Sequence, residues 1–271
     1  MIVLYNNTII MREGVAVMKK YKNFIIYGII LLIACYLPFF EEWKFNIKGF
    51  IEFTKQEHYT NMFNYLTYAN GKIFILIYPL IISYVSIKKF HELYHSGMLN
   101  QICERESYKV YIKKEILKIY LNNALVYFCY IWLMFFICLI LFKGNMSLDS
   151  NGLNPIFFAF ISSMLSIIFS IFIINISLVV TRYCKKFSIS IVLSYLIFIL
   201  YSIVSELLIG TVVENILPYP GTLNSFSIFN MVILDGNILI ISIYAFILLI
   251  LTTMIVILSY KNKEKVLREY E

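Results

Sequence analysis

The sequence predicts an all-α (all-helical) integral membrane protein, and three observations support that prediction. Of the 271 residues, 61% are apolar and 14% are charged, whereas a typical soluble domain has about 25% charged residues. The mean hydropathy is +0.79. Six apolar segments are long enough to cross the roughly 30 Å hydrocarbon core of a bilayer as helices. We therefore expect a six-helix membrane bundle.

The six predicted spans are rich in Ile, Leu, Phe and Val, and Glu206 is the only charged residue in them. The spans cover residues 24–40, 73–87, 121–142, 155–181, 187–209 and 238–260. The second span is the shortest, and Pro79 near its middle is expected to kink it. The fourth places small and polar residues at three- and four-residue intervals, which favours close helix packing. These residues are Ser162, Ser163, Ser166, Ser170, Asn175 and Ser177.

The distribution of basic residues predicts the orientation of the chain. With both termini inside, 18 of the 23 Lys and Arg residues fall in cytoplasmic segments, as the positive-inside rule requires. The expected organisation is a cytoplasmic segment at 1–23, one membrane domain at 24–260 and a cytoplasmic tail at 261–271. Topology and anionic lipid account for the net charge of +7, so no nucleic-acid partner is expected.

Two features of the amino terminus bear on the mature chain. Met18 is followed by lysines that lead directly into the first span, and we hypothesise that it is the natural start. The segment Leu32-Ile33-Ala34-Cys35 has the form of a lipoprotein cleavage site. Because the apolar run continues to Phe40 and five more spans follow, we favour an ordinary first span.

Motifs for energy conversion are missing from this sequence. The P-loop pattern is absent, since Gly71-Lys72 is followed by Ile73 and not by Ser or Thr. We therefore expect no nucleotide hydrolysis by this chain itself. Glu206 lies near the outer end of the fifth span, where it either reaches the interface or, together with Asn175, lines a translocation path.

The segment 88–120 supports two specific hypotheses, of which the first is a zinc site. His91-Glu92-Leu93-Tyr94-His95 matches H-E-x-x-H, in which two imidazoles bind zinc and the glutamate activates water. Glu115 would be the third ligand of such a metalloprotease. Against this, lysines flank Glu115 and no second soluble lobe exists to form a substrate cleft.

The second hypothesis is a coupling segment that transmits force between a motor subunit and the spans. An apolar side and a charged side can be assigned to it. The apolar side would consist of Phe90, Leu93, Met98, Leu99 and Ile102. A solvated connector whose charges only fix topology is the simpler alternative, and spacing alone does not decide between the two.

The whole pattern resembles the small permease subunits of ABC-2 type transporters, which occur in bacterial drug and antimicrobial-peptide exporters and in bacteriocin self-immunity systems. Six spans, cytoplasmic ends, a sizeable first outer loop and a cytoplasmic segment after span two are shared features. In that family an acidic residue, glycine, an apolar residue, arginine, tyrosine and lysine lead into span three. This chain offers Glu92, Gly97, Ile102, Arg105, Ser107, Tyr111 and Lys114 in that order.

The resemblance implies a bundle like that of type V exporters in the bacterial cell membrane. Two permease chains, identical or different, would pair with two separate ATPase subunits that bind ATP and Mg, and this chain would hold no cofactor. Residues 88–115, and the turn at 182–186, would receive the force, with Arg105 most important for coupling. The loop 210–237 would re-enter the outer leaflet, and the substrate would be a peptide, drug or other amphipathic molecule. A non-transporting sensor or scaffold stays as a further alternative.

Overall fold

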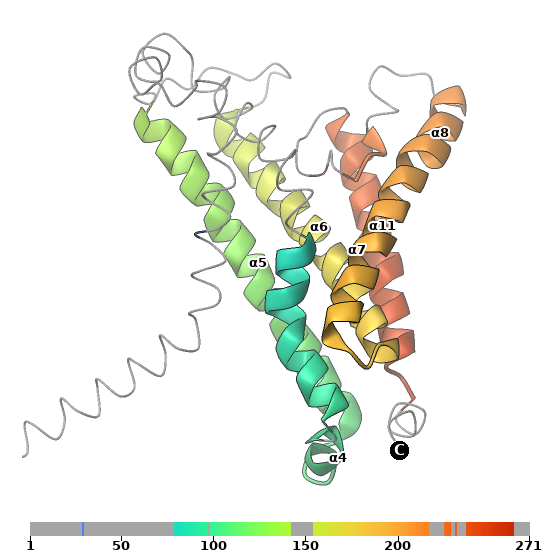
Figure 1. Cartoon of the computed structure of the whole chain (residues 1–271). Helices are drawn as coiled ribbons and strands as arrows, with labels where there is room; N and C mark the ends of the chain where they lie inside the picture. Colours follow the sequence, from blue (N-terminus) through green and yellow to red (C-terminus); the bar gives the residue numbers. More distant parts are fainter. Residues whose placement is uncertain are drawn as a thin grey trace, which may run out of the picture.

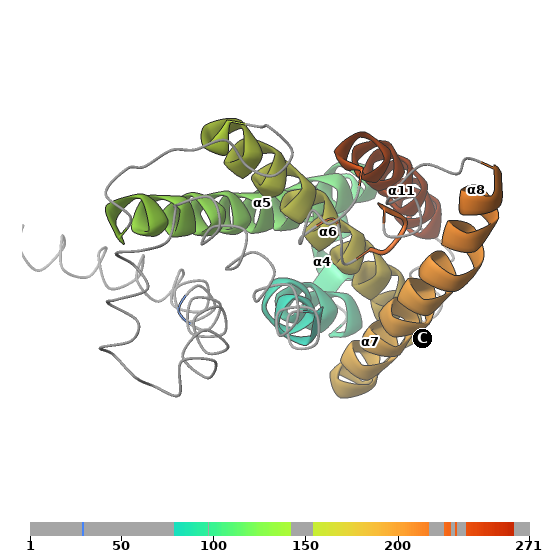
Figure 2. The same cartoon turned by 90° about the horizontal axis from the view of Figure 1, so that it is seen from above.

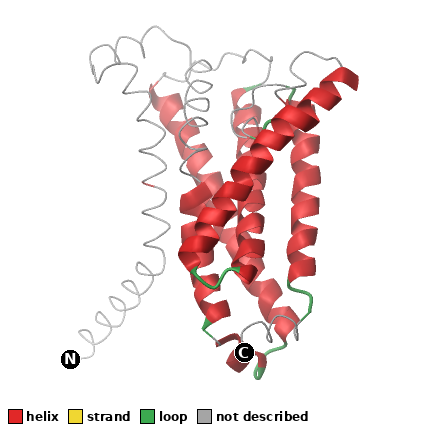
Figure 3. Cartoon of the chain, turned by 45° about the vertical axis from the view of Figure 1, so that its right-hand side comes forward, coloured by secondary structure: helices red, strands yellow, loops and turns green. Residues whose placement is uncertain are grey.

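The computed structural model describes residues 29, 79–96, 98–141, 154–216, 225–228, 231 and 237–262 (Figure 1). Every regular element within these residues is a helix (Figure 3), which confirms the all-helical class for this part of the chain. Several predictions fall wholly or mostly outside the described residues. They are the start at Met18, the Leu32–Cys35 site, the first span except residue 29, residues 73–78 of the second span, the first outer loop, Gly97, most of the predicted re-entrant loop 210–237 and the tail beyond 262.

The helices follow one another in a simple order. Residues 79–95 are helical, and the remaining helices are α4 (Met98–Cys103), α5 (Tyr108–Leu141), α6 (Pro155–Tyr183), α7 (Phe187–Val204), the π-helical turn η1 (Ser205–Gly210), α8 (Thr211–Ile216) and α11 (Ile238–Ser259). Among the described residues, four helices are long and apolar enough to cross a membrane. They cover Tyr108–Leu133, Ile156–Tyr183, Phe187–Ile216 and Ile238–Ser259. The last four of the six predicted spans are thus confirmed as apolar helices of membrane length, and the first two stay predictions.

Two helix boundaries differ from the predicted ones. α5 begins at Tyr108 and not at 121, because no Gly or Pro interrupts its 34 residues. At 1.5 Å per residue it is roughly 51 Å long, so it is longer than the membrane core is thick. The fifth span continues through η1 and α8 to Ile216 and does not end at 209, because Thr211 keeps right-handed helical backbone angles.

Asparagine side chains begin two of the membrane helices. The Asn154 carboxamide accepts a hydrogen bond from the Ile156 amide at 2.9 Å, and Pro155 occupies the first position of α6. Asn237 accepts in the same way from the Leu239 amide at the start of α11. Each side chain satisfies an amide that has no partner within its helix, so both helix starts are encoded locally.

α6 is the central helix of the bundle. It packs against α5, α7 and α11 (Figure 2), and 56% of an 18-residue stretch of it is buried, against 22–28% for the other three membrane-length helices. All five of its predicted packing serines are buried. Ser170 accepts a hydrogen bond from Asn123 of α5 at 2.5 Å, and the Ser177 and Ser83 hydroxyls are 2.7 Å apart. The prediction that small polar residues pack this helix is therefore confirmed.

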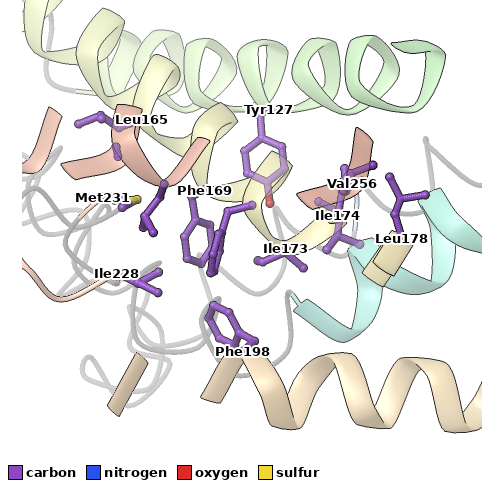
Figure 4. Packing of buried hydrophobic residues seen from close by; sticks show 14 of the residues in the cluster. Tyr127, Leu165, Phe169, Ile173, Ile174, Leu178, Phe198, Ile228, Met231 and Val256 are labelled. Atoms are coloured by element: carbon purple, nitrogen blue, oxygen red, sulfur yellow. The ribbon is translucent and has the colours of Figure 1, made fainter. Parts of the chain in front are cut away.

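The apolar core surrounds the same helix. Phe169 of α6 lies between Tyr127 of α5 and Phe198 of α7 (Figure 4). The rings of Phe169 and Phe198 meet edge to face with centroids 5.9 Å apart, an arrangement favoured by the aromatic quadrupole. α6 is thereby fixed on both sides.

Asn175 joins three helices by hydrogen bonds. Its carboxamide nitrogen donates to Thr252 Oγ1 of α11 at 2.9 Å and to Thr253 Oγ1 at 3.3 Å. Its oxygen accepts from the Tyr120 hydroxyl of α5. The Thr252 hydroxyl also donates to the Leu248 carbonyl of its own helix at 2.7 Å. Because water is scarce inside a membrane bundle, the Asn175 carboxamide depends on these side chains for its partners.

Replacement of Asn175 by Leu is expected to lower the stability of the purified protein by about 1–2 kcal/mol, because the Tyr120 hydroxyl loses its acceptor. The melting temperature in detergent measures the effect. Asn215→Leu, at an exposed position of α8, is the matched control. An Asn175 variant that melts with the wild type would show that the bridge adds no stability.

Candidate functional site at the basic end of the bundle

The basic residues of the described part collect at one end of the bundle. All eleven Lys and Arg residues of the described part lie in one of five places: the last two turns of helix 79–95, the turn between α4 and α5, the first third of α5, the last turn of α6 with the α6–α7 turn, or the second position after α11. Figure 1 places α4 and the end of α11 at the same end. The far end of the α7–α8 helix contains Glu214 instead. We call the first region the basic end.

At the basic end, His91 and His95 both face the last turn of α6. The Nε2 of His91 lies 3.0 Å from the carbonyl oxygen of Cys184, and the Nε2 of His95 lies 2.9 Å from that of Thr181. The two imidazoles are adjacent, with centroids 4.2 Å apart. Because a carbonyl can only accept, each Nε2 must bear the hydrogen and donate it.

The contact with the end of α6 explains why the two histidines are four residues apart. The final carbonyls of a helix have no amide partner within it. Residues four apart on helix 79–95 lie on one face, so His91 and His95 can each reach one of these carbonyls. The sequence H-x-x-x-H therefore has a structural role at the end of α6.

The zinc hypothesis gains no support from this arrangement. A nitrogen ligand must offer a lone pair to the metal, whereas both Nε2 atoms donate to carbonyls. Glu115, the predicted third ligand, instead forms an ion pair with Lys118 at 3.4 Å. Within the described residues, no group of three His, Cys, Asp or Glu side chains could hold a metal ion.

Further side-chain hydrogen bonds join the end of α11 to its neighbours. The buried Arg182 guanidinium donates to the carbonyl of Ser259. The Tyr108 hydroxyl donates to the Tyr260 carbonyl at 3.0 Å, and the Tyr260 hydroxyl donates to the Leu178 carbonyl at 2.7 Å. A cation beside a helix C-terminus is favourable because the helix dipole is negative there. These contacts connect α5, α6 and α11.

Aromatic rings complete the connection to helix 79–95. Phe90 and Tyr94 each meet the Tyr260 ring edge to face, with centroids 5.7 and 5.8 Å apart. His91 also contacts Phe187, the first residue of α7, at 5.2 Å. We use the name junction for His91, His95, Tyr108, Arg182 and Tyr260.

The structure places the predicted coupling residues around the junction. Glu92, Arg105 and Lys114 are exposed, and Tyr111 is half-buried. On the predicted apolar side, Phe90 and Leu99 are buried, Leu93 and Ile102 are half-buried, and Met98 is 53% exposed. The segment therefore has an exposed charged side and, except at Met98, an apolar side that packs inward.

Three junction residues were not singled out by the sequence analysis. Tyr108, Arg182 and Tyr260 form their hydrogen bonds with residues at least 70 positions away, so local spacing could not indicate them. A weak signal existed for Arg182, which directly follows a span and stands in the last turn of its helix.

The two candidates for a translocation path do not lie together. Asn175 is buried, eight residues before the end of α6 at the basic end. Glu206 is exposed, roughly 28 Å along the helix from Phe187, and its carboxylate accepts a hydrogen bond from the Ser227 hydroxyl at 3.4 Å. The two side chains are therefore at different depths, with Glu206 at the far end.

Comparison of the chain with protein-family models, with curated proteins and with solved structures finds no match. The functional conclusion therefore depends on the geometry of the junction together with the resemblance in the sequence.

Stability at the junction is expected to depend on pH through His91. Burial is the main cause that lowers the pKa of His91 below its ordinary value of 6.5, and the neighbouring His95 lowers it further. The hydrogen bond to the Cys184 carbonyl and the charge of Glu92 raise the pKa but do not cancel the decrease. Because the folded pKa is depressed, the unfolded chain binds more protons, and stability falls as the pH drops below about 6.5.

His91→Gln keeps a donor for the Cys184 carbonyl but does not titrate. We expect its melting temperature to fall less than that of the wild type between pH 7.5 and pH 5.5. Lys185→Gln, an exposed change at the same end, should keep the wild-type profile. Identical profiles for His91→Gln and wild type would contradict the assignment.

Proposed function

We propose that the chain is the membrane-spanning permease subunit of an ATP-driven exporter of the ABC-2 type. ATP and Mg bind to separate ATPase subunits, and the basic end faces the cytoplasm of a bacterial cell. The observation that supports the proposal is the junction. Its hydrogen bonds connect the exposed, charged segment 88–115 to the ends of α6 and α11.

The hydrogen bonds of the junction define a path for force. His91 and His95 join helix 79–95 to the end of α6, Arg182 joins α6 to α11, and Tyr108 joins α5 to α11. A push on the exposed side of residues 88–115 is therefore transmitted to several helices at once. Packed helices respond to such a push as rigid bodies that move between discrete arrangements.

The outer faces of the bundle leave room for a second permease chain. α7 exposes large apolar residues along its length, among them Leu193, Leu196 and Leu200, and α11 does the same at Leu251 and Met254. Such faces contact lipid or another membrane helix. Two chains, identical or different, would enclose the path of a peptide, drug or other amphipathic substrate, as in the family that the sequence resembles.

The alternative functions have less support. A metalloprotease would require His91 and His95 to give up their hydrogen bonds to α6 or to bind metal through their other nitrogens. No specific observation favours a sensor or scaffold.

Loss of Arg105 is expected to uncouple ATP hydrolysis from export. Arg105 is exposed at the turn between α4 and α5, so Arg105→Ala should leave the fold intact. Export should fall by roughly tenfold, within the range of typical coupling free energies, while ATPase activity persists. Lys118→Ala, which removes an exposed charge thirteen residues further along, should export normally. Normal export by Arg105→Ala would remove the coupling role from this residue.

Site-specific photo-crosslinking in cells tests the partner directly. A photoreactive amino acid at position 105 is expected to attach a soluble ATPase chain, because this position is exposed at the basic end. The same amino acid at position 214, exposed in α8, is the matched control and should not. Crosslinks to an ATPase from both positions or from neither would contradict the proposal.

A further inference from the structure

A groove of about 630 Å³ lies between α5 and α11 at the basic end. Its volume is within the range of small-molecule sites, roughly 300–1,000 Å³. The buried side chains of Ile112 and Val256 line it, as do the exposed side chains of Leu117, Ile257 and Leu258. The groove is therefore lined mainly by apolar side chains and is partly open to the outside of the bundle.

Three lysines also line this groove. Lys109 and Lys113 are one turn apart on α5, and Lys261 is the second residue after the end of α11. Among the described residues, none of the three side chains forms an ion pair or a hydrogen bond. The acidic residue of this part of α5, Glu115, is paired with Lys118. Within the part of the chain that the structure describes, the groove thus has three positive charges without an ion-pair or hydrogen-bond partner.

The charges and the apolar walls lie at different depths. The groove extends along α5 from Lys109 to Tyr120 and along α11 from Lys261 to Thr253, which is roughly 12–16 Å. The lysines are at the end next to the helix termini, where lipid headgroups lie, and the deeper part has apolar walls. A ligand with an anionic head and an apolar tail fits this arrangement.

We propose that the groove between α5 and α11 binds one anionic phospholipid. Lys109, Lys113 and Lys261 hold its phosphate, and an acyl chain lies along Leu117 and Ile257. Charge complementarity selects this occupant, since basic pockets between membrane helices bind anionic headgroups. The proposal does not depend on the transport function.

A lipid in the groove would contact two tyrosines whose hydrogen bonds join helices of the bundle. Tyr260 lines the groove and is part of the junction, and Tyr120 lines it and donates to Asn175. Anionic lipid is therefore expected to stabilise the protein as well as to bind it.

Native mass spectrometry of the full chain in detergent tests the site. Phosphatidylglycerol and phosphatidylcholine with identical acyl chains are added separately, and glycerol phosphate is added as a headgroup without chains. We expect one phosphatidylglycerol per chain, retained roughly tenfold more than phosphatidylcholine, and little retention of glycerol phosphate. The triple change Lys109→Gln, Lys113→Gln and Lys261→Gln should abolish the preference.

The matched control removes the same charge from the same end outside the groove, through Lys89→Gln, Lys185→Gln and Lys186→Gln. It should keep the preference. Leu117→Trp, at a 51% exposed position, fills the groove without removing charge and should lower lipid retention. Equal loss in both triple variants would reduce the effect to general surface charge and overturn the proposal. So would equal retention of both lipids, retention of glycerol phosphate alone, or a dimer that excludes lipid from the groove.

Discussion

The unsatisfied carbonyls at the ends of α6 and α11 are the constraint on which this structure depends. The last carbonyls of a helix have no internal partner, and they are costly to bury without one. Here both helices end at the basic end, and side chains from other helices satisfy them: His91, His95, Tyr108 and Arg182. The same hydrogen bonds that satisfy these carbonyls fix the positions of helix 79–95, α5 and α11. Local backbone chemistry thereby determines how the cytoplasm-facing segment, in the proposed orientation, is joined to the bundle.

Much of the fold could be predicted from the sequence, because membrane helices are encoded by local composition. The apolar runs located four membrane-length helices, and the serine spacing of span four identified the buried face of α6. Helix boundaries were less predictable. Polar residues from Lys109 to Lys118 suggested a separate connector, although lysine, glutamate and leucine all favour helix, and α5 runs through them. The fifth span was expected to end at 209, just before Gly210, although a glycine within an otherwise apolar helix does not by itself end it.

The sequence indicated where along the chain the candidate site lies, but it did not indicate which atoms its side chains contact. The burial pattern of segment 88–120 agrees with the predicted charged and apolar sides, except at Met98, which is exposed. The H-E-x-x-H pattern had two interpretations, and only the position of α6 showed which atoms the histidines meet. Arg182 and Tyr260 act through partners far away in the sequence, and such pairs leave no local pattern. A pattern of residue types indicates what chemistry is possible, whereas the surrounding helices decide which part of it is used.

In the proposed function, the junction transmits force from a separate ATPase to the membrane helices. Affinity purification of the full chain from its native membrane in mild detergent tests this role. The co-purifying chains are identified by mass spectrometry, and the metal content of the same sample is measured. The account predicts a stoichiometric ATPase subunit and no stoichiometric zinc. Recovery of the chain without an ATPase and with one equivalent of zinc would contradict it and would return His91, Glu92 and His95 to consideration as an active site.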